Sequence, residues 1–134
     1  MNKHKTEAIK AFISGPNCCQ AVLGSYAEEL GLSAKLAKNI ARPFGGGIVN
    51  TRNICGAASG MVMVLGLKYA DELEKVEFNS MVQKALLEFE RLAGALDCYS
   101  LTQVPFGEKM PPEHKHTCSK YIRIACDIID DLEE

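Results

Sequence analysis

The sequence predicts an all-α protein, a compact bundle of about five or six helices that forms one domain over residues 1–134. Two observations favour this fold class. Stretches that alternate apolar and polar residues, as half-buried strands do, are nearly absent. Apolar residues instead recur at helical spacing, and capping residues, glycines and prolines mark the ends of these segments. A chain of this length buries enough apolar surface to fold without disulfides.

The N-terminal part of the chain predicts three helices, each bounded by a residue that starts or stops a helix. They cover about residues 5–13, 17–30 and 33–42. Asn17 and Ser33 are suitable N-caps, because their side chains accept hydrogen bonds from free backbone N–H groups. Gly31 and Pro43 are the corresponding stop signals.

The remainder predicts four helices. A buried helix covers about residues 55–69, two long helices cover about residues 71–96 and 118–132, and a short helix covers about residues 98–102. The longest carries Phe78, Val82, Leu86 and Phe89 near helical spacing. Residues 44–53 contain a run of glycines and predict a loop. Residues 103–117 contain three prolines and a glycine, and predict a surface loop or lid.

Charge and hydropathy exclude several classes of partner. The net charge is −2 and no dense basic patch occurs, so we expect no nucleic acid or anionic membrane as partner. The most apolar stretch, residues 57–67, is interrupted by Ser59, Gly60 and Gly66 and is too short to span a bilayer. The N-terminus has no apolar segment of secretory length. We therefore expect a cytoplasmic protein, in which thiols are kept reduced.

Six cysteines are the most informative feature of the composition: Cys18, Cys19, Cys55, Cys98, Cys118 and Cys126. Three of them, Cys18, Cys55 and Cys118, fall at or next to predicted helix starts. Free N–H groups and the helix dipole favour a thiolate there, and the thiolate is the form that binds metals or attacks electrophiles. We predict that four cysteines converge on one site. Cys19 and Cys126 lie among apolar residues of their helices and are interpreted as packing residues.

Small residues follow Cys55 directly, and a run of three glycines stands upstream of it at residues 45–47. Glycine is unfavourable inside a helix, so residues 56–60 indicate a backbone that approaches something closely. The neighbour is another helix, within one chain or across a homodimer, or else a cofactor. Gly45, Gly46 and Gly47 lack the Lys-Ser/Thr ending of a P-loop and follow no strand, so nucleotide binding is discounted.

These residues resemble the C_GCAxxG_C_C family of putative redox-active proteins. The resemblance rests on Cys55-Gly56-Ala57-Ala58-Ser59-Gly60, on Asn17-Cys18 followed by Gln20-Ala21-Val22, on residues 44–47, and on Val64-Leu65-Gly66-Leu67. It implies a redox role for four matched cysteines: Cys18, Cys55, Cys98 and Cys118. Iron–sulfur ligation by these four is the attractive form of that role. Backbone at Gly45, Gly46, Gly47 and Gly56 would then approach the cluster, and a redox partner protein is implied.

Two alternatives stay open. One is thiol–disulfide or sulfur-handling chemistry without a metal. The other is a zinc-binding structural or interaction module, which is weaker because the chain lacks the short paired spacings of structural zinc sites. No Ser/His/Asp or Cys/His arrangement can be argued from spacing, so no enzyme class is assigned. His114 and His116 precede Cys118 but are interpreted as solvated. The sequence leaves open the cluster nuclearity, and whether Cys18 or Cys19 is the ligand.

Overall fold

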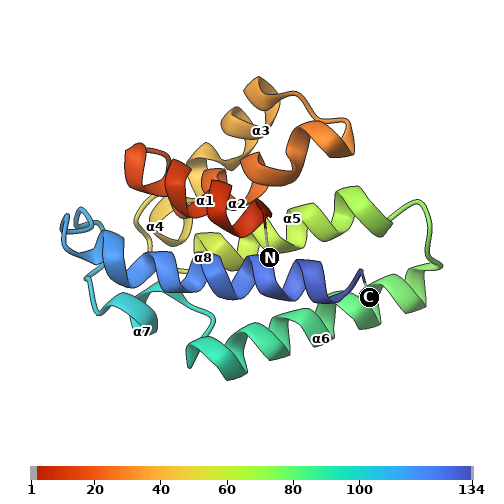
Figure 1. Cartoon of the computed structure of the whole chain (residues 1–134). Helices are drawn as coiled ribbons and strands as arrows, with labels where there is room; N and C mark the ends of the chain where they lie inside the picture. The colour runs from red at the N-terminus through yellow and green to blue at the C-terminus, as the bar shows by residue number, and fades with distance from the viewer. Residues whose placement is uncertain (1–2, 134) are drawn as a thin grey trace.

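The computed structural model describes residues 3–133 and shows an all-α fold (Figure 1). Within this range there is no strand, and one isolated bridge joins Ile54 to Asp97. The longer helices are α1 (Lys3–Ser14), α2 (Cys18–Ala27), α3 (Ala34–Ala41), α5 (Gly56–Tyr69), α6 (Lys75–Ala93) and α8 (His114–Asp131). The short ones are η1 (Glu28–Leu30), η2 (Arg42–Phe44), α4 (Gly45–Ile48) and α7 (Cys98–Thr102). The predicted fold class is confirmed, with more helical segments than expected.

Local signals placed the N-terminal helices well. Asn17 caps α2: its side chain accepts a hydrogen bond from the backbone N–H of Gln20, whose side chain accepts one from the N–H of Asn17. The side chain of Ser33 likewise accepts the N–H of Leu36 at the start of α3. Gly31 ends η1 in the left-handed conformation, with φ at 88°.

Three predicted helix boundaries differ from the structure by three or four residues. The last helix begins at His114, not near residue 118, so the predicted loop ends earlier. Its first turn forms directly behind Pro111 and Pro112, whose carbonyls accept the N–H groups of His114 and Lys115. Proline is favourable at a helix start, because the N–H that it lacks would make no hydrogen bond within the helix there. The helix predicted over residues 71–96 is shorter at both ends: α6 begins at Lys75, after the N-cap Glu74, and ends at Ala93, because Gly94 caps it with φ at 103°.

The small residues of α5 let it pack closely on α2. A Cβ added to Gly60 would lie 3.0 Å from the Cβ of Val22 and 3.2 Å from the carbonyl oxygen of Cys19. Ala57 and Ala58 are fully buried in the same region. The sequence leaves open whether residues 56–60 approach another helix or a cofactor, and in the structure they approach α2, a helix of the same chain. The α2–α5 pair forms the centre of the core, with α1, α3 and α8 packed on α2.

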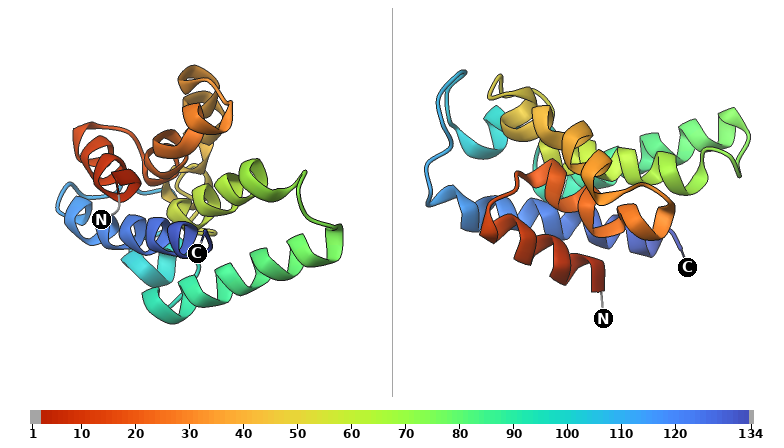
Figure 2. Two further views of the ribbon diagram at one scale, coloured as in Figure 1. Left: turned by 45° about the vertical axis from the view of Figure 1, so that its right-hand side comes forward. Right: turned by 90° about the horizontal axis from the view of Figure 1, so that it is seen from above.

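One end of the bundle collects the irregular segments. In Figure 1 and in the right-hand view of Figure 2, α4, α7 and the loop before α8 lie together at the end remote from the C-terminus. The cysteine-bearing starts of α2, α5 and α7 contribute to this region, as described below. Within residues 3–133, no helix combines the length and apolar character needed to cross a membrane.

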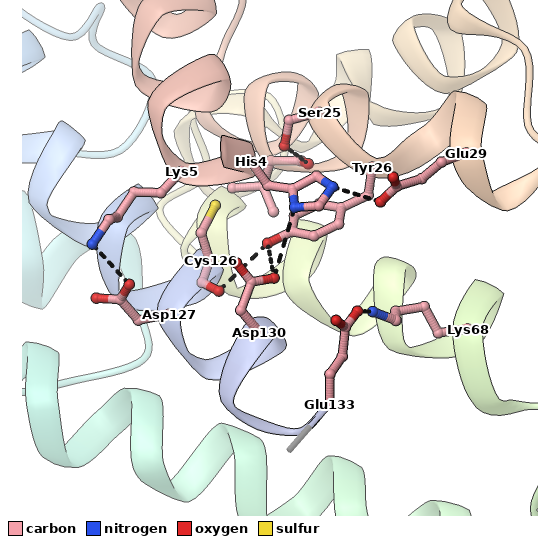
Figure 3. A network of polar contacts seen from close by, with 11 residues as sticks. His4, Lys5, Ser25, Tyr26, Glu29, Lys68, Cys126, Asp127, Asp130 and Glu133 are labelled. Carbon is pink, nitrogen blue, oxygen red and sulfur yellow. Dashed lines mark hydrogen bonds and ion pairs between the residues drawn. The ribbon is translucent and has the colours of Figure 1, made fainter. Parts of the chain in front are cut away.

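A polar network joins α1, α2 and α8 on another part of the bundle (Figure 3). The ring of His4 stacks on that of Tyr26, with the centroids 4.1 Å apart. The hydroxyl of Tyr26 donates to a carboxylate oxygen of Asp130 over 3.0 Å, and Nε2 of His4 lies 2.5 Å from a carboxylate oxygen of Glu29. Burial, followed by the negative charges of Cys126 and Asp130, raises the pKa of Tyr26. The hydroxyl therefore stays a hydrogen-bond donor.

Candidate four-cysteine site

Four cysteines come from four different segments. Cys18 is the first residue of α2, Cys55 is the N-cap of α5, and Cys98 is the first residue of α7. Cys118 stands in the second turn of α8, so the prediction that it begins a helix is wrong. Cys98 takes its place as the third cysteine at a helix start, because Asp97 caps α7 by accepting the N–H of Ser100.

Cys18 and Cys55 form a hydrogen-bonded pair of thiols. The Cys55 side chain lowers the pKa of Cys18, and the backbone N–H groups of Cys19 and Ala57 add to this effect while burial opposes it. The same hydrogen bond, together with burial, raises the pKa of Cys55 well above its usual value. Cys18 is therefore the more acidic thiol of the pair, and Cys55 donates the hydrogen bond to it.

A short stretch of paired backbone positions Cys55 beside Cys98. The bridge between Ile54 and Asp97 places their flanking residues opposite each other. The N–H of Cys55 donates to the carbonyl of Leu96 over 2.7 Å, and the N–H of Cys98 donates to the carbonyl of Asn53 over 2.6 Å. Both side chains are buried. Cys55 and Cys98, which are distant in sequence, are thus held on neighbouring segments of the chain.

Cys118 completes the group. Burial raises its pKa to about 12, and the negative charges of Cys18 and Cys98 add to this rise. Tyr121, one turn further along α8, also has a raised pKa, from burial and then from the charges of Cys118, Cys55 and Cys98. Electrostatic interactions thus link Cys18 with Cys55, Cys18 with Cys118, and Cys98 with Cys118.

The remaining cysteines face elsewhere. Cys19 is fully buried, with its Sγ 3.9 Å from Sδ of Met63. Burial raises its pKa to about 12. Cys126 is also fully buried, on α8. Of the adjacent cysteines 18 and 19, Cys18 therefore belongs to the site, since it is half-buried and its thiol is hydrogen-bonded to that of Cys55.

Glycines near the site pack directly on cysteine side chains. A Cβ added to Gly56 would lie 2.5 Å from Sγ of Cys18, and one added to Gly47 would lie 2.8 Å from Cβ of Cys98. Gly45 and Gly46 pack instead on the side chains of Asn17 and Asn50. The predicted close approach is found, and its partners are atoms of this chain. Contact of these glycines with a cofactor stays a prediction.

The glycines also begin a left-handed turn. Five consecutive residues, 46–50, have positive φ, among them the β-branched Ile48 at 69° and Val49 at 44°. Left-handed backbone costs an L-residue roughly 1–2 kcal/mol, more readily tolerated at Asn50 than at β-branched residues. The carbonyls of Gly46 and Gly47 accept the N–H groups of Arg52 and Asn53 and close the turn. The glycine run hints at this turn, but nothing in the sequence predicts that it continues through Val49.

Arg52 is a residue of the site that sequence reasoning missed. Its side chain is buried, with 5% of the residue exposed. One guanidinium nitrogen donates to Sγ of Cys98 over 3.5 Å, and others donate to the carbonyls of Pro105 and Glu108. The cation lowers the pKa of Cys118 against the effect of burial. Arg52 therefore supplies positive charge to the cysteines and ties the loop before α8 to them.

The histidines near Cys118 are not arranged as metal ligands with it. Nε2 of His114 lies 3.2 Å from the carbonyl oxygen of Thr102, and His116 is exposed. Nδ1 of His114 is buried without a hydrogen-bond partner among the described residues. Within residues 3–133, no three His, Cys, Asp or Glu side chains are arranged to hold a single metal ion.

Comparison with known proteins assigns this chain to a family. The family model described as "Putative redox-active protein (C_GCAxxG_C_C)" matches residues 16–132, which include all four cysteines and the small-residue motif after Cys55. Searches of curated proteins and of solved structures find no significant match. On the extent of the family match, the chain belongs to the C_GCAxxG_C_C family of putative redox-active proteins.

Proposed function

We propose that Cys18, Cys55, Cys98 and Cys118 hold an iron–sulfur cluster, and that the protein transfers electrons or senses redox state. The observation that carries this proposal is that the four cysteines, from four segments, are neighbours in turn: Cys55 adjoins Cys18 and shares a stretch of paired backbone with Cys98, and Cys18 and Cys118 line one cavity. Four cysteine thiolates are the usual ligand set of such clusters. A cluster distributes its thiolates over two or more irons, so its ligands need not converge on one point as those of a single ion do.

The surroundings suit a group with several thiolates. Three of the four cysteines stand at helix starts, and backbone N–H groups face the sulfur atoms of two of them, Cys18 and Cys55. Arg52 brings a buried positive charge and a hydrogen bond to Cys98. Hydrogen bonds to the sulfurs and the burial of a cluster set its reduction potential. When bound, the cluster would supply one-electron transfer to a partner protein, while the chain provides ligands, charge compensation and shielding from water.

A second candidate function is reversible disulfide formation, favoured by the hydrogen bond between Cys18 and Cys55. A thiolate next to a thiol is the arrangement of a dithiol redox pair. In exchange with a partner protein, the Cys18 sulfur would attack the partner's disulfide and Cys55 would then displace the partner from the mixed disulfide; the two Sγ atoms become joined, and two electrons and two protons pass to the partner, whose disulfide becomes a dithiol. This candidate gives Cys98 and Cys118 no direct part. Structural zinc remains the weaker candidate, because the chain lacks paired ligand spacings.

Anaerobic purification tests the proposal. We expect a coloured protein whose iron and acid-labile sulfide contents match, and whose visible spectrum reports the cluster type. Replacing any one of the four cysteines by serine should remove colour and iron, because each is a ligand. Cys126→Ser is the matched control and should retain both.

The outcomes separate the candidates. A colourless protein that fails to bind iron after reconstitution, and in which only Cys18→Ser and Cys55→Ser abolish reversible oxidation, would overturn the cluster and favour the dithiol pair. Bound zinc in place of iron would favour a structural or regulatory metal site. Equal tolerance of all four serine substitutions would overturn every function that uses this site.

A further inference from the structure

A cavity of about 360 Å³ opens beside the cysteines. It lies between the start of α2, α4 and the segment that leads into α8, and both Cys18 and Cys118 line it. Among the six cysteines, Cys18 is the one that is not buried. The cavity is therefore the route by which a molecule from solution reaches a cysteine of the site. Its volume is within the range of small-molecule sites in proteins.

The charges around this cavity are of one sign. Arg42 and Lys115 are its charged lining residues, and no carboxylate lines it. Nζ of Lys115 lies 2.5 Å from the carbonyl oxygen of Phe12 and 4.2 Å from the centre of its ring, so its position is fixed. Neither cation forms an ion pair within residues 3–133. Two unneutralised cations at the mouth of a small cavity favour a negatively charged occupant.

The rest of the lining is largely apolar. Phe12, Val49, Met110 and Pro111 contribute carbon-rich walls. A fully hydrated inorganic ion would gain nothing from such walls, whereas an organic molecule would bury apolar surface against them. The lining therefore combines an anion-binding rim with an apolar wall and a thiol.

We propose that this cavity binds a small organic anion, an apolar body bearing carboxylate groups, as the small-molecule partner of the cysteine site. Arg42 and Lys115 hold its carboxylates, and its other end lies against Cys18. The role as a redox partner rests on the proposed function, whereas the binding of the anion does not.

The reactivity of Cys18 in the metal-free protein tests this inference. Two disulfide reagents are compared: dithiobis-nitrobenzoate, which carries carboxylates, and dithiodipyridine, which is uncharged. In each, the Cys18 thiolate attacks one sulfur of the reagent, a mixed disulfide forms, and the other half leaves with the electron pair as a coloured thiolate or thione. We expect the double variant Arg42→Gln/Lys115→Gln to lower the rate with the anionic reagent on the order of tenfold. The rate with the uncharged reagent should change by less than about twofold.

Matched controls isolate the cavity from the net charge. Lys120→Gln/Arg123→Gln removes the same charge from exposed positions of α8 and should leave both rates unchanged. Lys115→Arg keeps the charge and should retain the rate with the anionic reagent. Cys18→Ser should abolish the fast phase with both reagents. Thermal unfolding of each variant verifies that it is folded.

Three results would overturn the inference: equal slowing of both reagents, no slowing of either, or the same effect in the Lys120/Arg123 control. Because the assay uses metal-free protein, its outcome is independent of whether a cluster binds. If the reaction is charge-selective but the protein never binds iron, the anion site is supported and the cluster is overturned. If the protein binds a cluster but the reaction is not charge-selective, the cluster is supported and the anion site is overturned.

Discussion

Sγ of Cys18 occupies the space beside Gly56 in which a side chain would begin. A Cβ built on Gly56 would stand 2.5 Å from that sulfur, 3.0 Å from the carbonyl oxygen of Phe44 and 3.2 Å from the backbone nitrogen of Cys19. Two of these three neighbours are backbone atoms, which cannot rotate away. The glycine that follows Cys55 in the sequence motif thus allows Cys18 to reach Cys55.

We therefore predict that Gly56→Ala separates Cys18 from Cys55. The added methyl group should displace the start of α2 from that of α5, at a cost of about 1–3 kcal/mol in the free energy of unfolding. Loss of the hydrogen bond from Cys55 should also raise the pKa of Cys18 toward its ordinary value. The pH dependence of alkylation by iodoacetamide, followed by mass spectrometry on metal-free protein, measures that change.

Gly66→Ala is the matched control, since Gly66 lies in the same helix with no atom within 4 Å of the added Cβ. It should stabilise the helix by up to about 1 kcal/mol and leave Cys18 unchanged. If Gly56→Ala gave the same pair of results, the close contact with Cys18 would have no bearing on the thiol.

Around this contact the sequence predicts the helix ends, but not which of the adjacent cysteines 18 and 19 belongs to the site. Asn17, Ser33 and Gly31 act through neighbouring residues, so local rules place the helix ends that they control. The choice of Cys18 over Cys19 depends on the rotation of α2 against α5, which is set by distant packing at Gly56 and Gly60. Composition and spacing cannot supply that rotation, so the choice stays open until the structure is known.

Arg52 was missed for a related reason. An isolated arginine in a polar segment is usually exposed. Its burial depends on the carbonyls of Pro105 and Glu108, more than fifty positions away, and on the left-handed turn that aims it. The early start of α8, by contrast, has a local cause in Pro111 and Pro112 and lay within the reach of sequence rules.

The role of Arg52 leads to a second prediction. Arg52→Met leaves the carbonyls of Pro105 and Glu108 without this donor and removes the cation beside Cys98. Hydrogen bonds to charged groups contribute about 1.5–3 kcal/mol each, so we expect the free energy of unfolding to fall by about 3 kcal/mol. Limited proteolysis should become faster within residues 103–113. Urea denaturation and mapping of the cleaved bonds measure the two effects.

Arg91→Met serves as the control for Arg52→Met. Arg91 pairs with Glu88 on the exposed face of α6, where solvent screens the interaction. Stability and cleavage should both stay at wild-type values. Unchanged cleavage in Arg52→Met would contradict the assignment of Arg52 as the anchor of this loop.

Alkaline pH should destabilise the protein through Cys126. Burial, with help from Asp130 and Asp127, raises the pKa of this thiol from 9.0 to about 12. The unfolded chain therefore loses a proton above about pH 9 that the folded chain retains, so stability present below pH 9 is lost as the pH rises toward 12. Across this interval Cys126 alone should lower the free energy of unfolding by up to about 1.4 kcal/mol per pH unit.

Comparison of wild type with Cys126→Ala isolates that contribution. Both proteins are unfolded in urea with a thiol reductant at a series of pH values from about 7 to 11. The alanine variant should be less stable at neutral pH, because it leaves a cavity in the core. The gap between the two should narrow above pH 9, because only the wild type carries this thiol. Parallel curves throughout would show that the burial of Cys126 has no linkage to pH.

The last prediction concerns the contact between Tyr26 and Asp130. The hydroxyl of Tyr26 is buried between α1, α2 and α8, and donates to Asp130 over 3.0 Å (Figure 3). Tyr26→Phe keeps the ring that stacks on His4 but leaves this partly buried carboxylate with one donor fewer. We expect a loss of about 1–2 kcal/mol in the free energy of unfolding, measured by urea denaturation. Tyr99→Phe, at a half-exposed ring, should cost nothing measurable. The rate of alkylation of Cys18 should be unchanged in both variants, because the network around Tyr26 does not contact the cysteine site. Slower alkylation of Cys18 in Tyr26→Phe would contradict this and show that the two regions are coupled.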